Sequence, residues 1–243
     1  MPLDQNFLRK VGPLYSAEMG TELISPLLYS LLRMTRSRTV LEIGAGYTTP
    51  FILRALKDND TDEKKEIAQI KRLIKARDTE TEMNIVPEYY SSHLRKPSLF
   101  SIDSLTHSGT TAHRVKMMAK KAGLNPYLRM INADFKNCSK KLRKAVRSFD
   151  FIWFDCGGYD DYVDFLKIYW SLINPKGGFL LLHSTLTNRA IRKIHDQLKK
   201  RQKREFNNFE LLSILEPHKL IQNSVTLIRI TSKFTAPIYT EWP

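Results

Sequence analysis

Two glycines stand where a short apolar run gives way to a helical pattern. In the stretch "TVLEIGAGYTTPFILRAL", residues 39–56, the apolar run ends at Gly44 and Gly46, and an amphipathic segment follows. Glycine lets the backbone turn tightly and approach a ligand closely, because no Cβ atom intervenes. Phosphates, dinucleotides and adenosyl-sulfonium compounds are all bound at such turns.

The residues around the two glycines disfavour the first two of these ligands. A phosphate-binding P-loop ends in Lys followed by Ser or Thr, and "GAGYTTPF" contains no lysine. A dinucleotide-binding turn has a third glycine or an alanine where its helix opens, whereas this chain has Thr49 and then Pro50. The acidic Glu42 inside the apolar run is also unexpected at a dinucleotide site.

An acidic residue stands at the end of each of three further apolar runs. Asp103, Asp134 and Asp155 each lie at the predicted carboxyl end of a separate strand, the edge at which open α/β sheets bind ligands. An adenosyl-sulfonium cofactor presents a sulfonium, an ammonium group, ribose hydroxyls and an adenine amine, which are positive charges or hydrogen-bond donors. Ionised carboxylates only accept hydrogen bonds, so they are suitable partners. The pattern therefore favours this third ligand.

The elements that must position these residues alternate between short apolar strands and helical segments. This alternation predicts an α/β fold, in which a mostly parallel sheet is covered by helices on both faces. The last two apolar runs are joined by a short polar link, so we expect them to pair antiparallel as a C-terminal hairpin. The seven predicted strands are residues 39–44, 99–103, 128–133, 149–155, 178–184, 209–217 and 224–231.

The length of 243 residues and the hydrophobic fraction of 42% suit a single domain, residues 1–243. We expect residues 1–37 to form a helical cap. Residues 57–97 are expected to form an insertion between the first helix and the second strand, because a plain crossover needs only about a dozen residues. The apolar runs are too short to span a membrane, and only two cysteines occur, so we expect a cytoplasmic protein without disulfides.

The net charge of +14 is the unusual feature of the composition. A basic surface attracts nucleic acids, but most of the lysines and arginines lie in amphipathic helical stretches. We therefore interpret them first as solvated helix faces. The densest tract is residues 189–204.

The glycine turn and the strand-end acids together resemble the motifs of the Rossmann-like, class I S-adenosylmethionine-dependent methyltransferases. "VLEIGAGYTT" resembles the first motif, "LFSIDSL" the second and "MINADF" the third, and the Pro-Lys-Gly-Gly turn before the fifth strand is also typical. The resemblance implies that S-adenosylmethionine is the cofactor. It implies that Glu42 and the glycine turn meet the amino-acid end, that Asp103 holds the ribose and that Asp134 with Phe135 meets the adenine. The full predicted cofactor site is Glu42, Gly44, Ala45, Gly46, Thr48, Thr49, Asp103, Ser104, Asp134, Phe135 and Asp155.

The segment "DCGGYDDYVDFLKIY" resembles the small-molecule O-methyltransferase branch of this family. It lacks the Asn/Asp-Pro-Pro-Tyr tetrad of the enzymes that methylate exocyclic amines, and no proline precedes Cys156, which is interpreted as a small buried residue. Metal-dependent members carry an Asp-Asn pair where this chain has His183 and Ser184, so we expect a mechanism without a metal ion. His183, with Asp155, is the first candidate for the catalytic base. His93 and His107 are weaker candidates.

Five residues are candidates for binding the substrate. Tyr15 and Glu18 lie in the N-terminal segment, next to Met19, and such a segment forms part of the substrate wall in small-molecule members of the family. For Tyr89 and Tyr90, core packing is at least an equal alternative to an aromatic pocket. The five are Tyr15, Glu18, Tyr89, Tyr90 and Tyr159.

Two other functions stay open at this point. The chain could be an RNA or protein methyltransferase that docks through its basic helices, or a binding protein that keeps the fold without catalysis. Nucleic acid is thus a less favoured partner than a small molecule, and assembly as a homodimer is also open.

Overall fold

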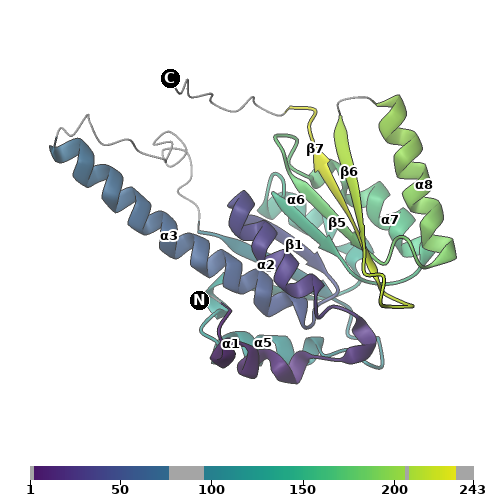
Figure 1. Ribbon diagram of the computed structural model, residues 1–243, viewed down its shortest axis with the longest axis horizontal. Helices are drawn as coiled ribbons and strands as arrows, with labels where there is room; N and C mark the ends of the chain where they lie inside the picture. Colours follow the sequence, from purple (N-terminus) through teal and green to yellow (C-terminus); the bar gives the residue numbers. More distant parts are fainter. Residues whose placement is uncertain (1–2, 77–95, 206–207, 234–243) are drawn as a thin grey trace.

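The computed structural model describes residues 3–76, 96–205 and 208–233. Within them lies a seven-stranded sheet with the strand order β3-β2-β1-β4-β5-β7-β6 (Figure 1). Strands β1 to β5 run parallel, and β7 runs antiparallel to both of its neighbours, β5 and β6. The predicted Rossmann-like fold class is confirmed. The strands are β1 (Thr39–Ile43), β2 (Ser98–Asp103), β3 (Leu128–Asn132), β4 (Phe151–Phe154), β5 (Phe179–His183), β6 (Phe209–Leu215) and β7 (Ser224–Ile230).

Helices cover both faces of the sheet. The helices of the described residues are α1 (Gln5–Val11), α2 (Ile24–Thr35), α3 (Thr48–Ala76), α5 (Ala112–Lys121), α6 (Ser139–Ala145), α7 (Tyr159–Tyr169) and α8 (Arg189–Arg204), with short 3-10 turns η1 (Gly12–Leu14), η2 (Ala17–Met19), η3 (Asn125–Tyr127), η4 (Phe135–Asn137) and η5 (Trp170–Leu172). Successive residues of a strand point to opposite faces of the sheet, so the side chains of β1 belong to two apolar layers. Leu41 and Ile43 pack with α6, α7 and α8, whereas Val40 packs with α1, α2 and α3.

Helix α3 is longer than the sequence predicts. The expected insertion from residue 57 does not begin as a separate element, because the helix after the glycine turn continues unbroken to Ala76. Ion pairs hold its middle turns against the end of α2 and the start of β1: Arg33 pairs with Asp62, Arg36 with Glu66 and Arg38 with Glu63. These side chains are partly or largely buried, so this stretch of α3 belongs to the packed body of the protein. Residues 77–95, the rest of the insertion, lie outside the described residues.

The segment before β1 reaches the carboxyl edge of the sheet. Helix α1 packs on α3 through Phe7 and Phe51, whose rings meet edge to face at 5.2 Å. The turns η1 and η2 then bring Leu14 and Met19 to the end of the sheet at which the predicted site residues lie. Among the described residues, every helix is too short or too polar to cross a membrane.

Candidate cofactor and active site

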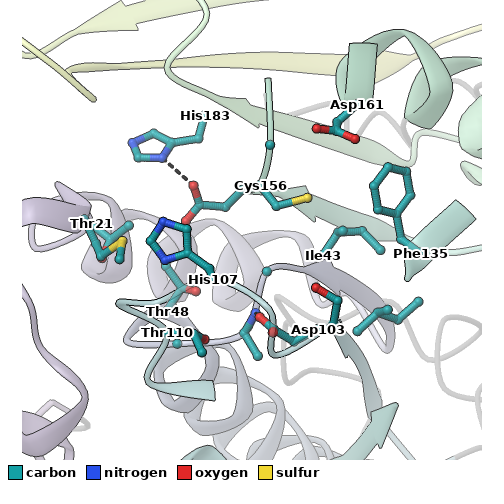
Figure 2. A pocket seen from close by; sticks show the side chains of 18 of the residues that line it. Thr21, Ile43, Thr48, Asp103, His107, Thr110, Phe135, Cys156, Asp161 and His183 are labelled. Atoms are coloured by element: carbon teal, nitrogen blue, oxygen red, sulfur yellow. Dashed lines mark hydrogen bonds and ion pairs between the residues drawn. The ribbon is translucent and has the colours of Figure 1, made fainter. Parts of the chain in front are cut away.

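One cleft lies along the carboxyl ends of β1 to β5 and has a volume of about 910 Å³. It lies where β1 pairs with both β2 and β4, the point at which the strand order reverses and at which open α/β sheets bind ligands. Figure 2 shows side chains from several loops pointing into it. Ten of the predicted site residues line the cleft: Gly44, Ala45, Gly46, Thr48, Asp103, Ser104, Asp134, Phe135, Asp155 and His183.

Gly44 is required by its backbone conformation and by its neighbour. Its φ is +93°, and a Cβ atom added there would lie 2.2 Å from the carbonyl oxygen of Asp155. A larger residue would therefore separate the end of β1 from the end of β4. At Gly46 an added Cβ would make only an ordinary contact with Thr111, so the steric requirement there is weaker. The turn thus lies close against β4, and its other side faces the cleft.

Glu42 lies beneath the glycine turn and outside the cleft lining. It is fully buried, and its two carboxyl oxygens accept hydrogen bonds from the hydroxyls of Thr48 (2.7 Å), Thr49 (2.8 Å) and Ser101 (2.7 Å). Burial raises the pKa of Glu42 to about 7, against the lowering effect of these hydrogen bonds. Thr49 also accepts a hydrogen bond from the Gly46 amide at 3.0 Å. The acid therefore joins β1, β2 and the start of α3, and shapes the turn from below.

Asp103 joins the glycine turn to the loop after β2. Its Oδ2 accepts a hydrogen bond from the Ala45 amide at 3.0 Å, and its Oδ1 accepts one from the Leu105 amide at 2.7 Å. Leu105 has a φ of +60°, a conformation that is uncommon for a residue other than glycine. Each carboxyl oxygen keeps a second lone pair that can accept from a ligand.

Asp134 and Phe135 border the cleft beyond β3. Asp134 is exposed, and its Oδ1 accepts a hydrogen bond from the Lys136 amide at 2.9 Å, which caps the short turn η4. The ring of Phe135 is buried against Phe154 and Tyr169, with centroid distances of 5.7 and 6.2 Å. The carboxylate therefore remains accessible while the ring forms one wall.

Asp155 and His183 form a hydrogen-bonded pair between the ends of β4 and β5. The distance from Asp155 Oδ1 to His183 Nδ1 is 2.6 Å, as Figure 2 shows. His183 is only 2% exposed, whereas the side chain of Asp155 is 25% exposed. Burial lowers the pKa of His183, but Asp155, with smaller contributions from the Gln222 backbone and Glu216, raises it, and the net shift is upward. Both side chains line the cleft, and Asp155 is the more exposed of the two.

Cys156 lies next to this pair and lines the cleft. Burial and the nearby carboxylate of Asp155 raise the pKa of its thiol. The thiol therefore stays protonated at neutral pH, and a protonated thiol is a poor nucleophile. Among the described residues, three or more His, Cys, Asp or Glu side chains do not gather anywhere as a metal ion would need.

The predicted substrate residues lie mostly outside the cleft lining. The exposed ring of Tyr15 meets the ring of Tyr47 edge to face at 5.4 Å, and it is Tyr47 that lines the cleft. Glu18 is exposed, and the neighbouring Met19 faces the cleft instead. Tyr159, the first residue of α7, is partly buried and packs against the core. Tyr89, Tyr90 and His93 lie outside the described residues.

Several residues of the cleft are missing from the predicted site. His107, a weaker candidate base, is exposed in the lining, and its Nδ1 accepts a hydrogen bond from the Gly109 amide at 3.2 Å. The other additions come from the N-terminal segment, from the glycine turn, from α7 and from the β6–β7 turn. They include Leu14, Thr21, Tyr47, Asp161 and Gln222.

Lys219 fixes the N-terminal segment to the β6–β7 turn. Its ammonium group lies 2.5 Å from Glu22 and 2.6 Å from Glu216, and it donates a hydrogen bond to the Gly20 carbonyl at 3.2 Å. Burial lowers the pKa of Lys219, but the two carboxylates outweigh it and raise the pKa. The sequence alone suggests only an exposed polar turn here. The three-residue spacing of Glu216 and Lys219 was a visible signal, whereas the contact with Glu22 was not.

The comparisons with known proteins agree with this geometry. A family model described as a methyltransferase domain matches residues 41–185. No curated protein sequence matches the chain significantly.

Three solved structures share the fold over nearly the whole chain. The O-methyltransferase TomG from Streptomyces achromogenes, involved in tomaymycin synthesis and in complex with S-adenosylmethionine, is 17% identical, with a TM-score of 0.58, covering 94% of this chain and 90% of its own. An O-methyltransferase from Bacillus cereus in complex with S-adenosylhomocysteine (SAH) is 13% identical, with a TM-score of 0.57, covering 93% and 91%. The SAH-bound methyltransferase PaMTH1 from Podospora anserina is 14% identical, with a TM-score of 0.57, covering 93% and 88%.

Proposed function

The chain belongs to the methyltransferase domain family, and from that premise we propose that it transfers a methyl group from S-adenosylmethionine to an oxygen atom of a small molecule. The observation that carries the proposal is the convergence of the glycine turn with Asp103, Asp134 and Asp155 in one cleft. The two O-methyltransferases described above, one solved with S-adenosylmethionine and one with SAH, support the choice of cofactor and of oxygen as the acceptor.

The residues of the cleft fit the proposed cofactor. The tight turn at Gly44 leaves backbone, without side chain, facing the place where the amino-acid end would bind. Asp103 would accept hydrogen bonds from the ribose hydroxyls with the lone pairs that the backbone amides leave free. The exposed carboxylate of Asp134 would accept from the adenine amine, beside the wall formed by Phe135.

The bound cofactor would supply a methyl group on a positively charged sulfur. The role of the protein is then to accept the proton of the acceptor hydroxyl. Asp155 is positioned to accept it, because its side chain reaches the cleft. His183 lies at the edge of the cleft, is almost fully buried and would orient the carboxylate through Nδ1. We therefore propose Asp155 as the group that meets the acceptor and His183 as the residue that positions it, acting without a metal ion.

Calorimetry with SAH tests the cofactor assignment. We expect SAH to bind, and Asp134→Ala to weaken binding by about 1–3 kcal/mol, the usual scale for a hydrogen bond to a charged group. Asp160→Ala, an exposed acid on α7, serves as the matched control and should leave the affinity unchanged. Binding of NAD or ATP in place of SAH would overturn the proposal.

The acceptor class requires a second measurement. The protein would be incubated with S-adenosylmethionine that carries a labelled methyl group and with a panel of candidate acceptors, with and without a chelator. The panel would contain phenols, catechols, carboxylic acids and amines. We expect the label in an ether or an ester, and equal turnover in both conditions. Label appearing only on nitrogen, or turnover that requires added magnesium, would contradict the proposed oxygen acceptor or the metal-free mechanism. Cofactor binding without turnover of any acceptor would favour a binding protein.

A further inference from the structure

The outer face of α8 carries a continuous stripe of basic side chains. At 3.6 residues per turn, the exposed residues of the helix fall on one arc, and the buried residues Ile191, Ile194, His195 and Leu198 fall on the opposite arc. Over the 16 residues of α8 the stripe is about 22 Å long. The basic stripe consists of Arg189, Arg192, Lys193, Lys199, Lys200, Lys203 and Arg204, with Asp196 as the one acid on the same arc.

These seven cations make no ion pair with any other described residue, which sets them apart from other basic residues of the protein. On the inner side of the same helix, Arg201 pairs with Glu205 at 2.8 Å and lies 4.2 Å from the centroid of the Trp170 ring. On η4, Lys136 bridges Asp161 and Asp164, both at 2.9 Å. The stripe thus concentrates seven positive charges, which Asp196 on the same arc and Glu205 next to Arg204 offset only in part. Such an arrangement costs folding free energy through self-repulsion, unless a polyanion binds to it.

The composition of the stripe restricts what it could bind. A helix that lies in a membrane surface needs large apolar side chains opposite its charges, and the apolar side chains of α8 are buried in the core instead. A surface for single-stranded nucleic acid needs exposed aromatic rings for base stacking, and the exposed arc of α8 has none. A protein interface usually has an apolar or aromatic centre, which is also missing from this arc. Rows of phosphate groups require charge alone.

The shape of the element favours one kind of phosphate array. Helix α8 lies at the edge of the protein beside β6 (Figure 1). The residues of its basic stripe are exposed. The major groove of B-form DNA is about 12 Å wide and admits an α-helix, whereas the deep, narrow major groove of an RNA duplex does not. We propose that the basic stripe of α8 docks on double-stranded DNA, with its cations contacting the phosphates along the groove and without reading the base sequence.

Fluorescence anisotropy with a labelled DNA duplex of mixed sequence tests this proposal. We expect binding that weakens steeply as salt increases, because each phosphate contact releases counterions. The variant Arg192→Gln/Lys193→Gln/Lys199→Gln/Lys200→Gln removes four cations and keeps side chains that favour a helix. It should bind at least about tenfold more weakly at moderate salt, and its slope of log K against log[salt] should be smaller by about three.

A control and three competing ligands make the outcome decisive. Lys116→Gln/Lys120→Gln/Lys121→Gln removes exposed cations from α5, on the other face of the sheet, and should change the affinity for DNA by less than threefold. Equal loss in this control would show that net charge, and not the stripe, causes binding. Absence of DNA binding would overturn the proposal. Equal or tighter binding of an RNA duplex, of a single strand or of vesicles containing phosphatidylserine would also overturn it.

Discussion

A carboxylic acid that water does not reach supports the glycine turn. The side chain of Glu42 is fully buried, and the hydroxyls of Thr48, Thr49 and Ser101 surround it. A buried carboxylate is costly unless such donors stabilise it, and the pKa of about 7 indicates that they do so only in part. The residue that the family resemblance assigns to the cofactor thus holds together the strands and the helix that form the turn.

The raised pKa of Glu42 makes stability depend on pH. In the unfolded chain a glutamate ionises near pH 4.5, whereas in the folded protein it keeps its proton up to about pH 7. The stabilisation that Glu42 gives the folded state is therefore fully present below about pH 4.5 and is lost as the pH rises through about 7. The loss in unfolding free energy is about 3 kcal/mol. Glu42→Gln cannot ionise and should lack this loss. We expect urea unfolding to show that the variant gains stability relative to the wild type between about pH 5 and about pH 8. If the difference in unfolding free energy between Glu42→Gln and the wild type is the same at about pH 5 and at about pH 8, Glu42 does not titrate in this range.

Asp155→Asn tests the residue proposed to accept the proton. The amide keeps the size of the side chain but cannot take a proton, so we expect kcat to fall by about 10²-fold or more. Affinity for SAH, measured by calorimetry, should change by less than tenfold. His183→Gln should lower kcat less than Asp155→Asn does, because it removes only the positioning contact. If SAH affinity falls as far as kcat in Asp155→Asn, the residue serves cofactor binding and not proton transfer.

At the scale of elements, a buried cation joins two segments that are far apart in the chain. Lys219 in the β6–β7 turn connects Glu22, just before α2, to Glu216. The side chains of Lys219 and Glu216 are only 14% and 13% exposed. Gly20 and Gln222 meet next to them, since a Cβ atom added at Gly20 would lie 2.7 Å from the Cβ of Gln222. Both segments line the cleft, so this cluster joins two parts of its wall.

Lys219→Met should loosen the N-terminal segment. The substitution leaves two carboxylates close together without their cation, and we expect a loss of about 1–3 kcal/mol in unfolding free energy. Hydrogen exchange should become faster in residues 12–23 and stay unchanged in β1 and β4. The double variant Lys219→Met/Glu22→Gln should recover part of the lost stability, because it removes one of the opposed charges. Lys176→Met, an exposed lysine before β5, is the control. Unchanged exchange in residues 12–23 would show that other contacts hold the segment.

At the scale of the whole molecule, two helical layers hold the strand ends in one line. The apolar side chains of β1, β2, β4 and β5 fill both layers, so the edge at which the acids converge is anchored on both faces. The cleft residues come from the segments after six different strands, β1 to β6, and from the N-terminal segment. A ligand that bridges these loops should therefore stabilise the folded state as a whole.

Ligand binding should be visible as a change in thermal stability. At SAH concentrations about 100 times the dissociation constant, mass action stabilises the native state by about 2.7 kcal/mol, which corresponds to a rise in Tm of roughly 5–10 °C. Asp134→Ala should show a smaller rise at the same SAH concentration, and its Tm without ligand should fall by only a few degrees, because the exposed side chain caps the short turn η4. Equal rises in both proteins would show that Asp134 does not contact the ligand.

The local chemistry of the sequence was sufficient for the fold class and for much of the cleft. The glycine turn, the acids at three strand ends and the alternation of strands with helices depend on residues close together in the chain, and such patterns are readable before folding. Ten of the predicted site residues accordingly line the observed cleft. The length of α3 was not predicted, because the charged residues that interrupt its apolar pattern have their partners on other elements, such as Arg33 and Arg36.

Contacts between segments that are distant in the sequence were decided only by the tertiary structure. The insertion of β7 between β5 and β6 follows from sheet pairing, and the chain order does not reveal it. The hydrogen bond of Ser101 to Glu42, the Asp155–His183 pair and the bridge from Lys219 to Glu22 each join residues that no spacing rule connects. Burial then decides their chemistry: His183 is enclosed while Asp155 stays accessible, and the basic face of α8 stays exposed and unpaired by the described residues. Exposure depends on what packs against a residue, and only the folded chain determines that.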